Sequence, residues 1–388
     1  MRTRLATVTI ACAAAAAALF GAQVGAATIA AGSTGHRGAS GFDPLYTLRI
    51  GSSSDVIVVG TRSCAKEPCL EILLTTNDGK TFTKLGSPPI TRASNGSIGP
   101  GSLDGLVFAN AQDGYAIEQR TGLSATTLYA TFDGGRTWHP EPLDPRISVE
   151  AEAATAHRFY FVLAACTRRD QPPCTWSLAV SRAGASGWTT LPFPEATQIN
   201  KDGFAAVGSR LGVWGHDVWI SLQWPRQVLA VSHDEGNTFT LLSDETIGSV
   251  AGCSLTAESA DQIWAECPTG MQVSFARSDD GGAHFGVLRI PGAFYGTGGG
   301  DFTPVTGSVA YFYNMAKYLW RDVVNPFELY RTTDGGRSFT PVGRLPLPSG
   351  WLVFTSRDDG LAVGYPPSGP RVLMRTADGG RHWQAAAT

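Results

Sequence analysis

The chain has 388 residues, a formal net charge of −3 at pH 7 and a hydrophobic content of 43%. This hydrophobic content excludes disorder of the whole chain. A weakly acidic chain with five lysines has no basic stripe to follow a nucleic-acid backbone, so nucleic acid is not an expected partner. The 46 glycines and 23 prolines are spread along the chain, which is typical of many tight turns between short strands.

The N-terminus has the pattern of an export signal. Arg2 and Arg4 supply a positive start, an apolar run follows, and small residues end the segment, so residues 1–26 are predicted to be a signal peptide. The apolar run is too short for a membrane span. Cys12 raises the alternative of a lipid anchor, but most of the apolar run still follows it. We therefore expect a secreted or cell-wall-associated protein without a membrane span, in which residues 27–43 form a flexible segment.

Cysteine usage agrees with an oxidising compartment. Six cysteines follow the predicted signal peptide in three close pairs: Cys64 with Cys69, Cys166 with Cys174, and Cys253 with Cys267. Six cysteines allow 15 connectivities, but each close pair can be bridged across one hairpin, which predicts three local disulfides. The alternative is a metal cluster. No pair has CxxC spacing and no histidine lies nearby at ligand spacing, so no metal site is predicted.

One eight-residue pattern recurs along the chain: Ser or Thr, any, Asp, any, Gly, any, any, aromatic. We call it the turn motif and number its copies 1 to 7 in chain order. Six copies carry an acid or its amide at the third position: Asn77, Asp133, Asp234, Asp280, Asp334 and Asp378. Copy 3, from Ser181 to Trp188, is worn, because Ala183 and Ala185 replace the acid and the glycine. Self-similarity at a regular period is typical of repeat folds.

The spacing of the copies predicts the fold. They begin 44 to 56 residues apart, which is the length that a four-stranded propeller blade with its loops requires. In the last unit three strand-like runs, at 351–355, 360–365 and 371–375, precede the motif. The motif then forms the hairpin between the third and fourth strands. The sequence therefore predicts an all-β chain in which residues 44–388 form a seven-bladed β-propeller of four-stranded antiparallel blades.

The composition of the turn motif indicates a structural role. The acid can accept hydrogen bonds from N–H groups of the turn, the glycine allows a positive φ, and the aromatic residue can pack between adjacent sheets. Asn77 can replace aspartate as the acceptor, whereas Ala183 cannot. We therefore expect copy 3 to be the least well held of the seven hairpins.

The seven copies resemble the Asp-box, or BNR, repeat of sialidases, sortilin-type receptors and Ycf48-like photosystem assembly factors. The resemblance covers nearly the whole chain after the predicted signal peptide. It implies a propeller, but the repeat occurs in proteins with unrelated tasks and so implies little about function. A chain with seven units and a copy in each is more similar to the Ycf48-like, non-catalytic type than to sialidases, which are six-bladed with fewer boxes.

The resemblance also defines an alternative, an exo-sialidase-like glycoside hydrolase. Such an enzyme would need an arginine cluster, a Tyr/Glu nucleophile pair and an acid/base carboxyl, and family members carry an Arg-Ile-Pro stretch near the start of the propeller. Here Arg289–Pro291 has that sequence but directly follows copy 5, where we expect Ile290 in an outer strand and Pro291 at its end. Three further carboxylates show no acid/base spacing: Glu118, Glu150 and Glu152. No catalytic residue and no cofactor is predicted.

The expected binding surface lies opposite the turn motifs. Hairpins of a propeller alternate between two faces, so the motifs share one face with the turns between first and second strands, and the longer loops occupy the other. Two long loops, 291–301 and 313–327, provide aromatic and charged candidates for ligand binding: Tyr295, Lys317, Tyr318, Trp320 and Arg321. The alternative is that the second loop only covers the propeller edge.

A second candidate loop contains Trp224 and Arg226. We therefore expect a monomeric, non-catalytic scaffold that binds an unidentified protein or glycan. The sequence leaves the closure of the ring open. Either residues 385–388 complete the last blade, or part of residues 27–43 is added to cover its exposed edge.

Overall fold

The computed structural model describes residues within the span 40–388. Within it the described residues are 41–51, 54–64, 68–90, 92–93, 102–119, 126–141, 143–144, 146–168, 171–192, 210–222, 228–243, 253–269, 272–290, 300–314 and 327–388. The predicted signal peptide lies outside these residues and stays a prediction. The described part contains 29 strands and no helix, and therefore no helix that could cross a membrane.

The strands form seven sheets in chain order, each an antiparallel set of four strands, which confirms the predicted seven-bladed β-propeller. Blade 1 comprises β1 (Phe42–Arg49), β2 (Val56–Ser63), β3 (Pro68–Thr75) and β4 (Thr83–Leu85). Blade 2 comprises β6 (Ser102–Phe108), β7 (Gly114–Gln119), β8 (Thr127–Thr131) and β9 (His139–Glu141), with the extra strand β5 (Arg92–Ala93). Blade 3 comprises β10 (Ile147–Thr155), β11 (Arg158–Arg168), β12 (Gln171–Arg182) and β13 (Thr189–Pro192).

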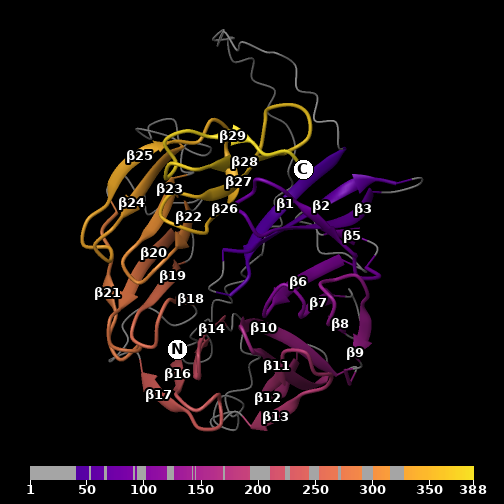
Figure 1. Cartoon of the computed structure of the whole chain (residues 1–388). Helices are drawn as coiled ribbons and strands as arrows, with labels where there is room; N and C mark the ends of the chain where they lie inside the picture. Colours follow the sequence, from indigo (N-terminus) through magenta and orange to yellow (C-terminus); the bar gives the residue numbers. More distant parts are fainter. Residues whose placement is uncertain are drawn as a thin grey trace, which may run out of the picture. The chain divides into compact units, whose positions relative to one another are not determined.

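Blades 4 to 7 comprise β14 (Arg210–Trp214), β15 (Asp217–Leu222), β16 (Val228–Ser232) and β17 (Thr240–Ser243); β18 (Ser254–Ala257), β19 (Ile263–Thr269), β20 (Gln272–Ser278) and β21 (Gly286–Val287); β22 (Gly300–Pro304), β23 (Ala310–Asn314), β24 (Glu328–Thr332) and β25 (Thr340–Arg344); and β26 (Ser349–Phe354), β27 (Gly360–Gly364), β28 (Val372–Thr376) and β29 (Gln384–Ala385). The blades follow one another around a ring, with the first strand of each blade on the inside (Figure 1).

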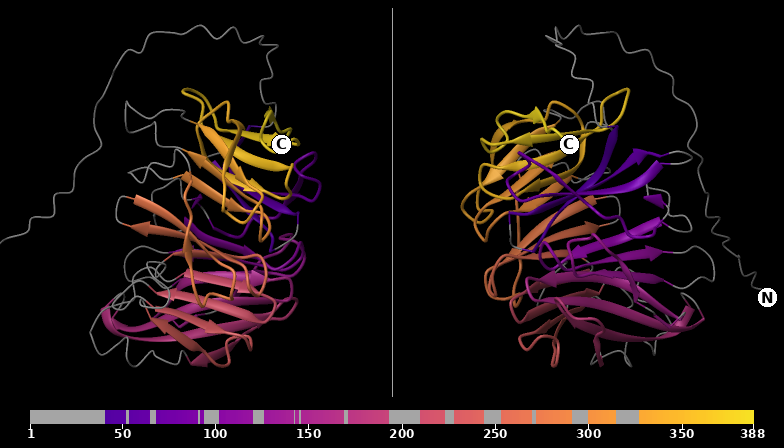
Figure 2. Two further views of the ribbon diagram at one scale, coloured as in Figure 1. Left: turned by 90° about the vertical axis from the view of Figure 1, so that its left-hand side faces the viewer. Right: turned by 45° about the vertical axis from the view of Figure 1, so that its right-hand side comes forward.

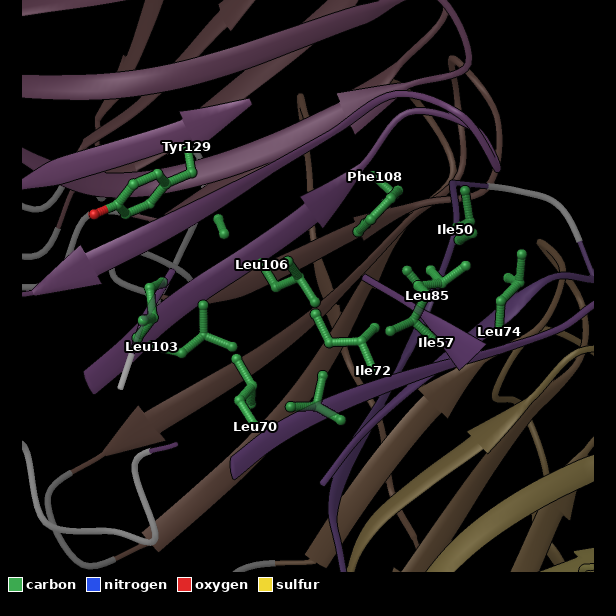
Figure 3. Packing of buried hydrophobic residues seen from close by; sticks show 13 residues of the cluster. Ile50, Ile57, Leu70, Ile72, Leu74, Leu85, Leu103, Leu106, Phe108 and Tyr129 are labelled. Atoms are coloured by element: carbon green, nitrogen blue, oxygen red, sulfur yellow. The ribbon is translucent and has the colours of Figure 1, made fainter. Parts of the chain in front are cut away.

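Each pair of neighbouring blades shares a hydrophobic core. Between blades 1 and 2, Ile57 and Ile72 pack against Leu103 and Leu106 (Figure 3), and the motif residue Trp138 is partly buried against this cluster. The aromatic residues of the other copies join the remaining cores in the same way: Phe82, Trp188, Phe239, Phe285, Phe339 and Trp383. The predicted packing of the motif aromatics between adjacent sheets is thus confirmed.

Copy 6 shows how the turn motif holds its hairpin. The Thr332 hydroxyl donates to Asp334 Oδ1 over 2.8 Å and accepts the N–H of Gly336 over 2.8 Å. Asp334 accepts the N–H of Ser338 over 3.0 Å and its hydroxyl over 2.6 Å. Gly335 and Gly336 have φ values of 74° and 84°. The acid is therefore a hydrogen-bond acceptor for its own turn, as its sequence position predicts.

Copy 3 departs from this arrangement. Ala183 offers no side-chain acceptor, and the Ser181 hydroxyl instead donates to the carbonyl of Gly187 over 2.7 Å. Asn77 of copy 1, by contrast, accepts the N–H of Thr81 over 2.9 Å. The relative weakness of the third hairpin stays a prediction about stability.

The motifs and the turns between first and second strands share one face of the ring. In blade 6 the N–H of Gly335 donates to the carbonyl of Ser308 over 2.9 Å. Four other copies make the same bond to their own blade: Gly134 to Gln112, Glu235 to His216, Gly281 to Asp261, and Gly379 to Asp358. These bonds confirm the predicted alternation of hairpins between two faces, and we call this the motif face.

In the described part of the chain, no strand is shared between blades 1 and 7. The outer strand of blade 7 comes from the C-terminus, where Gln384 lies opposite Arg375 in the antiparallel register of β28 and β29. Residues 384 and 385 therefore complete the last blade, as the first alternative predicts, whereas residues 27–40 of the second alternative lie outside the described residues. The first blade begins at Phe42, two residues before the predicted start. Strands β1 and β26 to β28 lie side by side, as Figure 2 also shows.

Two of the three predicted disulfides are present. Cys64 is bonded to Cys69, and Cys253 to Cys267. Cys166 and Cys174 lie opposite each other in the register of β11 and β12, but the structure describes only their backbone. This third disulfide stays a prediction.

The expected strand position of Ile290 is wrong. Strand β21 ends at Val287, and Ile290 lies beyond it. Ile290 is nevertheless buried, in the core between blades 5 and 6 together with Trp264 and Phe302. Its apolar character therefore reflects contact with the neighbouring blade and not pairing within its own sheet.

Candidate functional site

A cavity inside the ring measures about 750 Å³. The inner strands of six blades line it, namely β1, β10, β14, β18, β22 and β26. In blade 2 the inner edge is partly paired, because β5 adds to β6 in parallel, with Arg92 opposite Ser102 and Ala93 opposite Leu103. A cavity of this size is within the range of binding sites for small molecules or short chain segments.

Charged groups from blades 3 and 4 line the cavity at the motif face. Arg158 lies 2.6 Å from Glu235, and the Nδ1 atom of His216 lies 2.8 Å from the other oxygen of the same carboxylate. Glu235 is the fourth residue of copy 4 and has a φ of 63°, a conformation that costs energy for any residue with a Cβ. Five copies have glycine at this position. Glu235 therefore keeps a strained backbone while its side chain joins two blades.

Three carboxyl groups in or beside the cavity carry weakly compensated charge. Burial raises the pKa of Glu258 to about 7, although Arg49, 3.5 Å away, acts in the other direction. Burial also raises the pKa of Glu266 to about 7, although this residue of β19 is not part of the cavity lining. Burial and the nearby charge of Glu266 together raise the pKa of Asp301 to about 8, while a hydrogen bond from the N–H of Leu352 opposes this. These three carboxyls can therefore exchange protons near neutral pH.

Aromatic side chains supply the apolar part of the lining. Trp351 is 47% exposed, one of two large hydrophobic residues that are so exposed in the described part of the chain. Its ring centroid lies 5.5 Å from that of Tyr46 in β1. Trp214 of β14 also lines the cavity. Exposed tryptophan in a concave site is typical of surfaces that bind proteins or sugars.

The inner strands differ in how their free backbone edges are satisfied. In β26 the N–H of Leu352 donates to Asp301, and that of Phe354 donates to Thr303 over 3.4 Å. These two side chains of β22 therefore cover the edge of the next blade. Strand β22 itself ends in Pro304, which has no N–H to offer.

A second cavity, of about 320 Å³, continues along three of the same strands. It is lined by Ala151 and Glu152 of β10, by Arg210 and Leu211 of β14, and by Leu255 with Ser254 of β18. A third, of about 600 Å³, lies on the motif face between copies 3 and 4, and it shares Arg158 and Glu235 with the central cavity. The worn copy 3 thus borders a groove that leads to the cavity inside the ring.

The residues that the sequence singled out for binding lie outside the described part of the chain: Tyr295, Lys317, Tyr318, Trp320, Arg321, Trp224 and Arg226. Their role stays a prediction. Of the three carboxylates weighed for catalysis, Glu152 lines the second cavity, and Glu118 is buried beneath the Tyr129 hydroxyl. Glu150 accepts a hydrogen bond from Ser148 within its own strand.

Sequence reasoning missed the cavity residues, because most lie on ordinary alternating strands. One signal was visible, namely the glutamate at a glycine position of copy 4. The described lining contains two arginines, Arg49 and Arg158, and each lies beside a carboxylate. This arrangement differs from the three converging arginines that the sialidase-like alternative requires.

No family model and no curated protein sequence matches this chain. Among solved structures, it is similar to the β-propeller domain of the Trilobed protease from Pyrococcus furiosus, with 9% identity, coverage of 89% of this chain and 98% of that one, and a TM-score of 0.52. It is also similar to YCF48 bound to D1 peptide, with 15% identity, coverage of 73% and 80%, and a TM-score of 0.47. A third neighbour is Trypanosoma rangeli sialidase in complex with the inhibitor DANA, with 13% identity, coverage of 71% and 53%, and a TM-score of 0.37. At such identities the likeness shows the β-propeller fold alone.

Proposed function

We propose that this chain is an extracytoplasmic binding scaffold without catalysis, which receives a protein or glycan in its central cavity. The exposure of Trp351 inside a cavity of about 750 Å³ carries this proposal. A rigid ring that holds an apolar side chain in contact with water has a lining suited to a partner. The export-like N-terminus and the two disulfides support a location outside the cytoplasm.

The test is capture of partners with a cavity variant. Purified chain is immobilised and exposed to the native secretome and to a glycan array, and the Trp351→Ala variant is compared with Val287→Ala. Val287 is 67% exposed on the outer strand β21, away from the cavity lining, and so controls for loss of an exposed apolar side chain. We expect the Trp351→Ala variant to lose the captured partner and the Val287→Ala variant to keep it. Equal capture by both variants would place recognition elsewhere.

A glycosidase of sialidase type is the second candidate, favoured by one observation. Burial raises the pKa of both Asp301 and Glu266, and the charge of Glu266 adds to the shift of Asp301; a raised pKa is what the general acid of such an enzyme needs. The pairing of both lining arginines with carboxylates favours binding over this chemistry. A fluorogenic sialoside separates the two, because the scaffold hypothesis expects no hydrolysis above the rate without protein.

A further inference from the structure

The groove on the motif face between copies 3 and 4 lies at a junction that is built differently from its neighbours. In four blades a large residue of the second strand bonds to the next blade: Tyr115 to Ser181, Trp219 to Gly281, Trp264 to Thr306, and Tyr311 to Arg357. Tyr160 has the equivalent register position in blade 3, opposite Val180. Its buried hydroxyl has no partner among the described residues. The junction of blades 3 and 4 therefore lacks this bond, and the groove, which Val180 lines, opens there.

Copy 3 leaves one backbone donor beside this groove without an acceptor. In the six other copies the N–H at the seventh position of the motif donates to the acid or amide at the third position. Gly187 holds the seventh position of copy 3, and Ala183 provides no side-chain acceptor. In the part of the chain that the structure describes, no group accepts the N–H of Gly187, which lines the groove. An added Cβ on Gly187 would meet nothing within 4 Å, so the space beside it is open.

The turn of copy 3 also has a shape of its own. The other copies have positive φ values at the fourth and fifth positions, whereas copy 3 has them at Gly184 (76°) and Gly187 (79°). The hydroxyl at the first position accepts the N–H of the fifth residue in the six other copies. In copy 3 the Ser181 hydroxyl instead donates to the carbonyl of Gly187 over 2.7 Å. The carbonyl of Gly187 is therefore satisfied within the turn, and its N–H is not.

One positive charge of the groove is also uncompensated. Arg158 lies 2.6 Å from Glu235, so these two opposite charges compensate each other. Arg182, at the second position of copy 3, is exposed and has no acidic partner among the described residues. The apolar part of the lining consists of Val180, Trp188 and Leu191. The groove therefore combines a guanidinium and a backbone donor with an apolar surface, which together suit a carboxylate next to an apolar group.

We propose that this groove binds an acidic polypeptide segment. The carboxylate of an aspartate or glutamate of the partner pairs with Arg182 and accepts the N–H of Gly187, and a neighbouring apolar side chain packs against Trp188. An aspartate accepts the equivalent N–H in five other copies, so the partner supplies the chemistry that copy 3 lacks. The apolar lining favours a polypeptide over an acidic sugar. A groove of about 600 Å³ accommodates a few residues.

This inference goes beyond the proposed function, because it makes the motif face a second recognition surface. The test uses a labelled hexapeptide of alternating aspartate and leucine, with binding followed by fluorescence anisotropy. Two matched peptides accompany it, one with asparagine for aspartate and one with serine for leucine. We expect each to bind about tenfold more weakly than the parent peptide, because the first loses the charge and the second the apolar contact. Added salt should weaken binding of the parent peptide.

Arg182→Gln tests the charged contact. We expect the aspartate peptide to bind this variant about tenfold more weakly. The asparagine peptide should change by less than about twofold, because it has no charge to pair with the guanidinium. The matched control is Arg337→Gln, which removes an exposed arginine from copy 6 on the same face. It should change the affinity for either peptide by less than about twofold.

Ala183→Asp tests the backbone contact by restoring the acid of the motif. The new carboxylate competes with the partner for the N–H of Gly187 and places a negative charge near Arg182. We therefore expect binding of the aspartate peptide to weaken by at least about tenfold. Ala183 is partly buried, so if this variant does not fold, the exposed Arg182→Gln variant and the peptide series decide.

Equal binding of the aspartate and asparagine peptides would overturn the inference, as would an unchanged affinity of the Arg182→Gln variant for the aspartate peptide. Binding of an oligosaccharide of glucuronic acid without any peptide binding would assign the groove to an acidic sugar and overturn it too. Each of these outcomes leaves the proposed function standing, because Trp351 lines the central cavity and not the groove. Capture by the Trp351→Ala variant tests that function separately.

Discussion

Asp43 in β1 and Arg371, next to β28, are 328 residues apart in the sequence and form a two-pronged ion pair. Arg371 Nε lies 3.1 Å from Asp43 Oδ1, and Nη2 lies 2.9 Å from Oδ2. The N–H of Arg371 also donates to Oδ1 over 3.0 Å. Among the described residues blades 1 and 7 share no strand, so side-chain contacts hold the ring closed: this pair, the apolar contacts beside it, and the hydrogen bonds of Thr355 and Arg375 to Asp78.

The closing pair gives the first prediction. Asp43→Ala should lower the free energy of unfolding by about 1 to 2 kcal/mol, because it removes a two-pronged, partly buried ion pair and leaves the guanidinium without its partner. Urea unfolding measures the loss. Hydrogen exchange should rise first in β1 and β28, at the junction of the first and last blades.

The matched control is Asp144→Ala. Asp144 also forms a two-pronged pair, with Arg146, but the two residues are neighbours in one exposed turn. Exposed local pairs contribute little to stability, so we expect almost no change. Equal losses in the two variants would mean that the Asp43 pair has no special part in closing the ring.

The turn motif gives the second prediction. Asp334→Ala removes the acceptor of two hydrogen bonds from Ser338 and one from Thr332, so the melting temperature should fall by roughly 2 to 5 °C. Ligand affinity should not change, because Asp334 lies outside the cavity lining. Arg337→Ala, at an exposed position of the same copy, serves as the control. A melting temperature equal to that of the parent would contradict the structural role of the motif.

Much of the fold could be predicted from the sequence because the repeat is local. The run 360–365 differs by one residue from β27, and the motif aromatics pack between sheets as expected. The acid accepts hydrogen bonds from its own turn and the glycine supplies a positive φ in the same turn, so the eight-residue pattern is enough to predict both roles. Ring closure was open because it depends on contacts such as Asp43 with Arg371, which no local pattern encodes.

The site was harder to predict for a physical reason. Inner strands alternate like any other strand, so nothing in their residues indicates that Ala257 faces a cavity or that Asp301 covers the edge of the next blade. Ile290 is buried by a neighbouring blade, so in the sequence it has the same apolar character as a strand residue. Recognition loops could be proposed from aromatic content, but the cavity depends on the arrangement of six strands in space.

Three carboxyls in or beside the cavity give the third prediction, on pH. The pKa of Asp301 is raised to about 8 and those of Glu258 and Glu266 to about 7, whereas the unfolded chain releases these protons near pH 4. Between these values the folded state holds protons that the unfolded state has lost. The contribution of these groups to the free energy of unfolding is therefore fully present below about pH 4 and is lost as the pH rises toward 8.

Asp301→Asn tests this directly. Asparagine keeps an acceptor for the N–H of Leu352 but does not titrate, so the variant should be more stable than the parent at pH 8.5 by roughly 2 kcal/mol. The fall in stability between pH 5 and pH 8.5, measured by urea unfolding, should become shallower. Asp261→Asn, in an exposed turn, controls for the loss of one negative charge. Parallel pH profiles of the Asp301→Asn variant and the parent would refute the assignment.

Glu235 gives the last prediction, because two opposing effects meet at one residue. Its φ of 63° is strained, while its carboxylate joins Arg158 and His216. Glu235→Ala loses the ion pair and keeps the strain, whereas Glu235→Gly loses the ion pair and relieves the strain. We therefore expect the alanine variant to be less stable than the glycine variant by about 1 kcal/mol in urea unfolding.

The control for strain alone is Gly281→Ala, at the same position of copy 5. Gly281 has a φ of 73°, and an added Cβ would have space, 3.4 Å from the carbonyl oxygen of Ala260. This variant loses no ion pair, so its cost of about 1 kcal/mol should match the difference between the two Glu235 variants. If those variants are equally stable while Gly281→Ala is destabilised, the backbone at Glu235 is not strained. The reason for a glutamate at this glycine position would then lie in its side chain alone, in the link between blades 3 and 4 at the edge of the cavity.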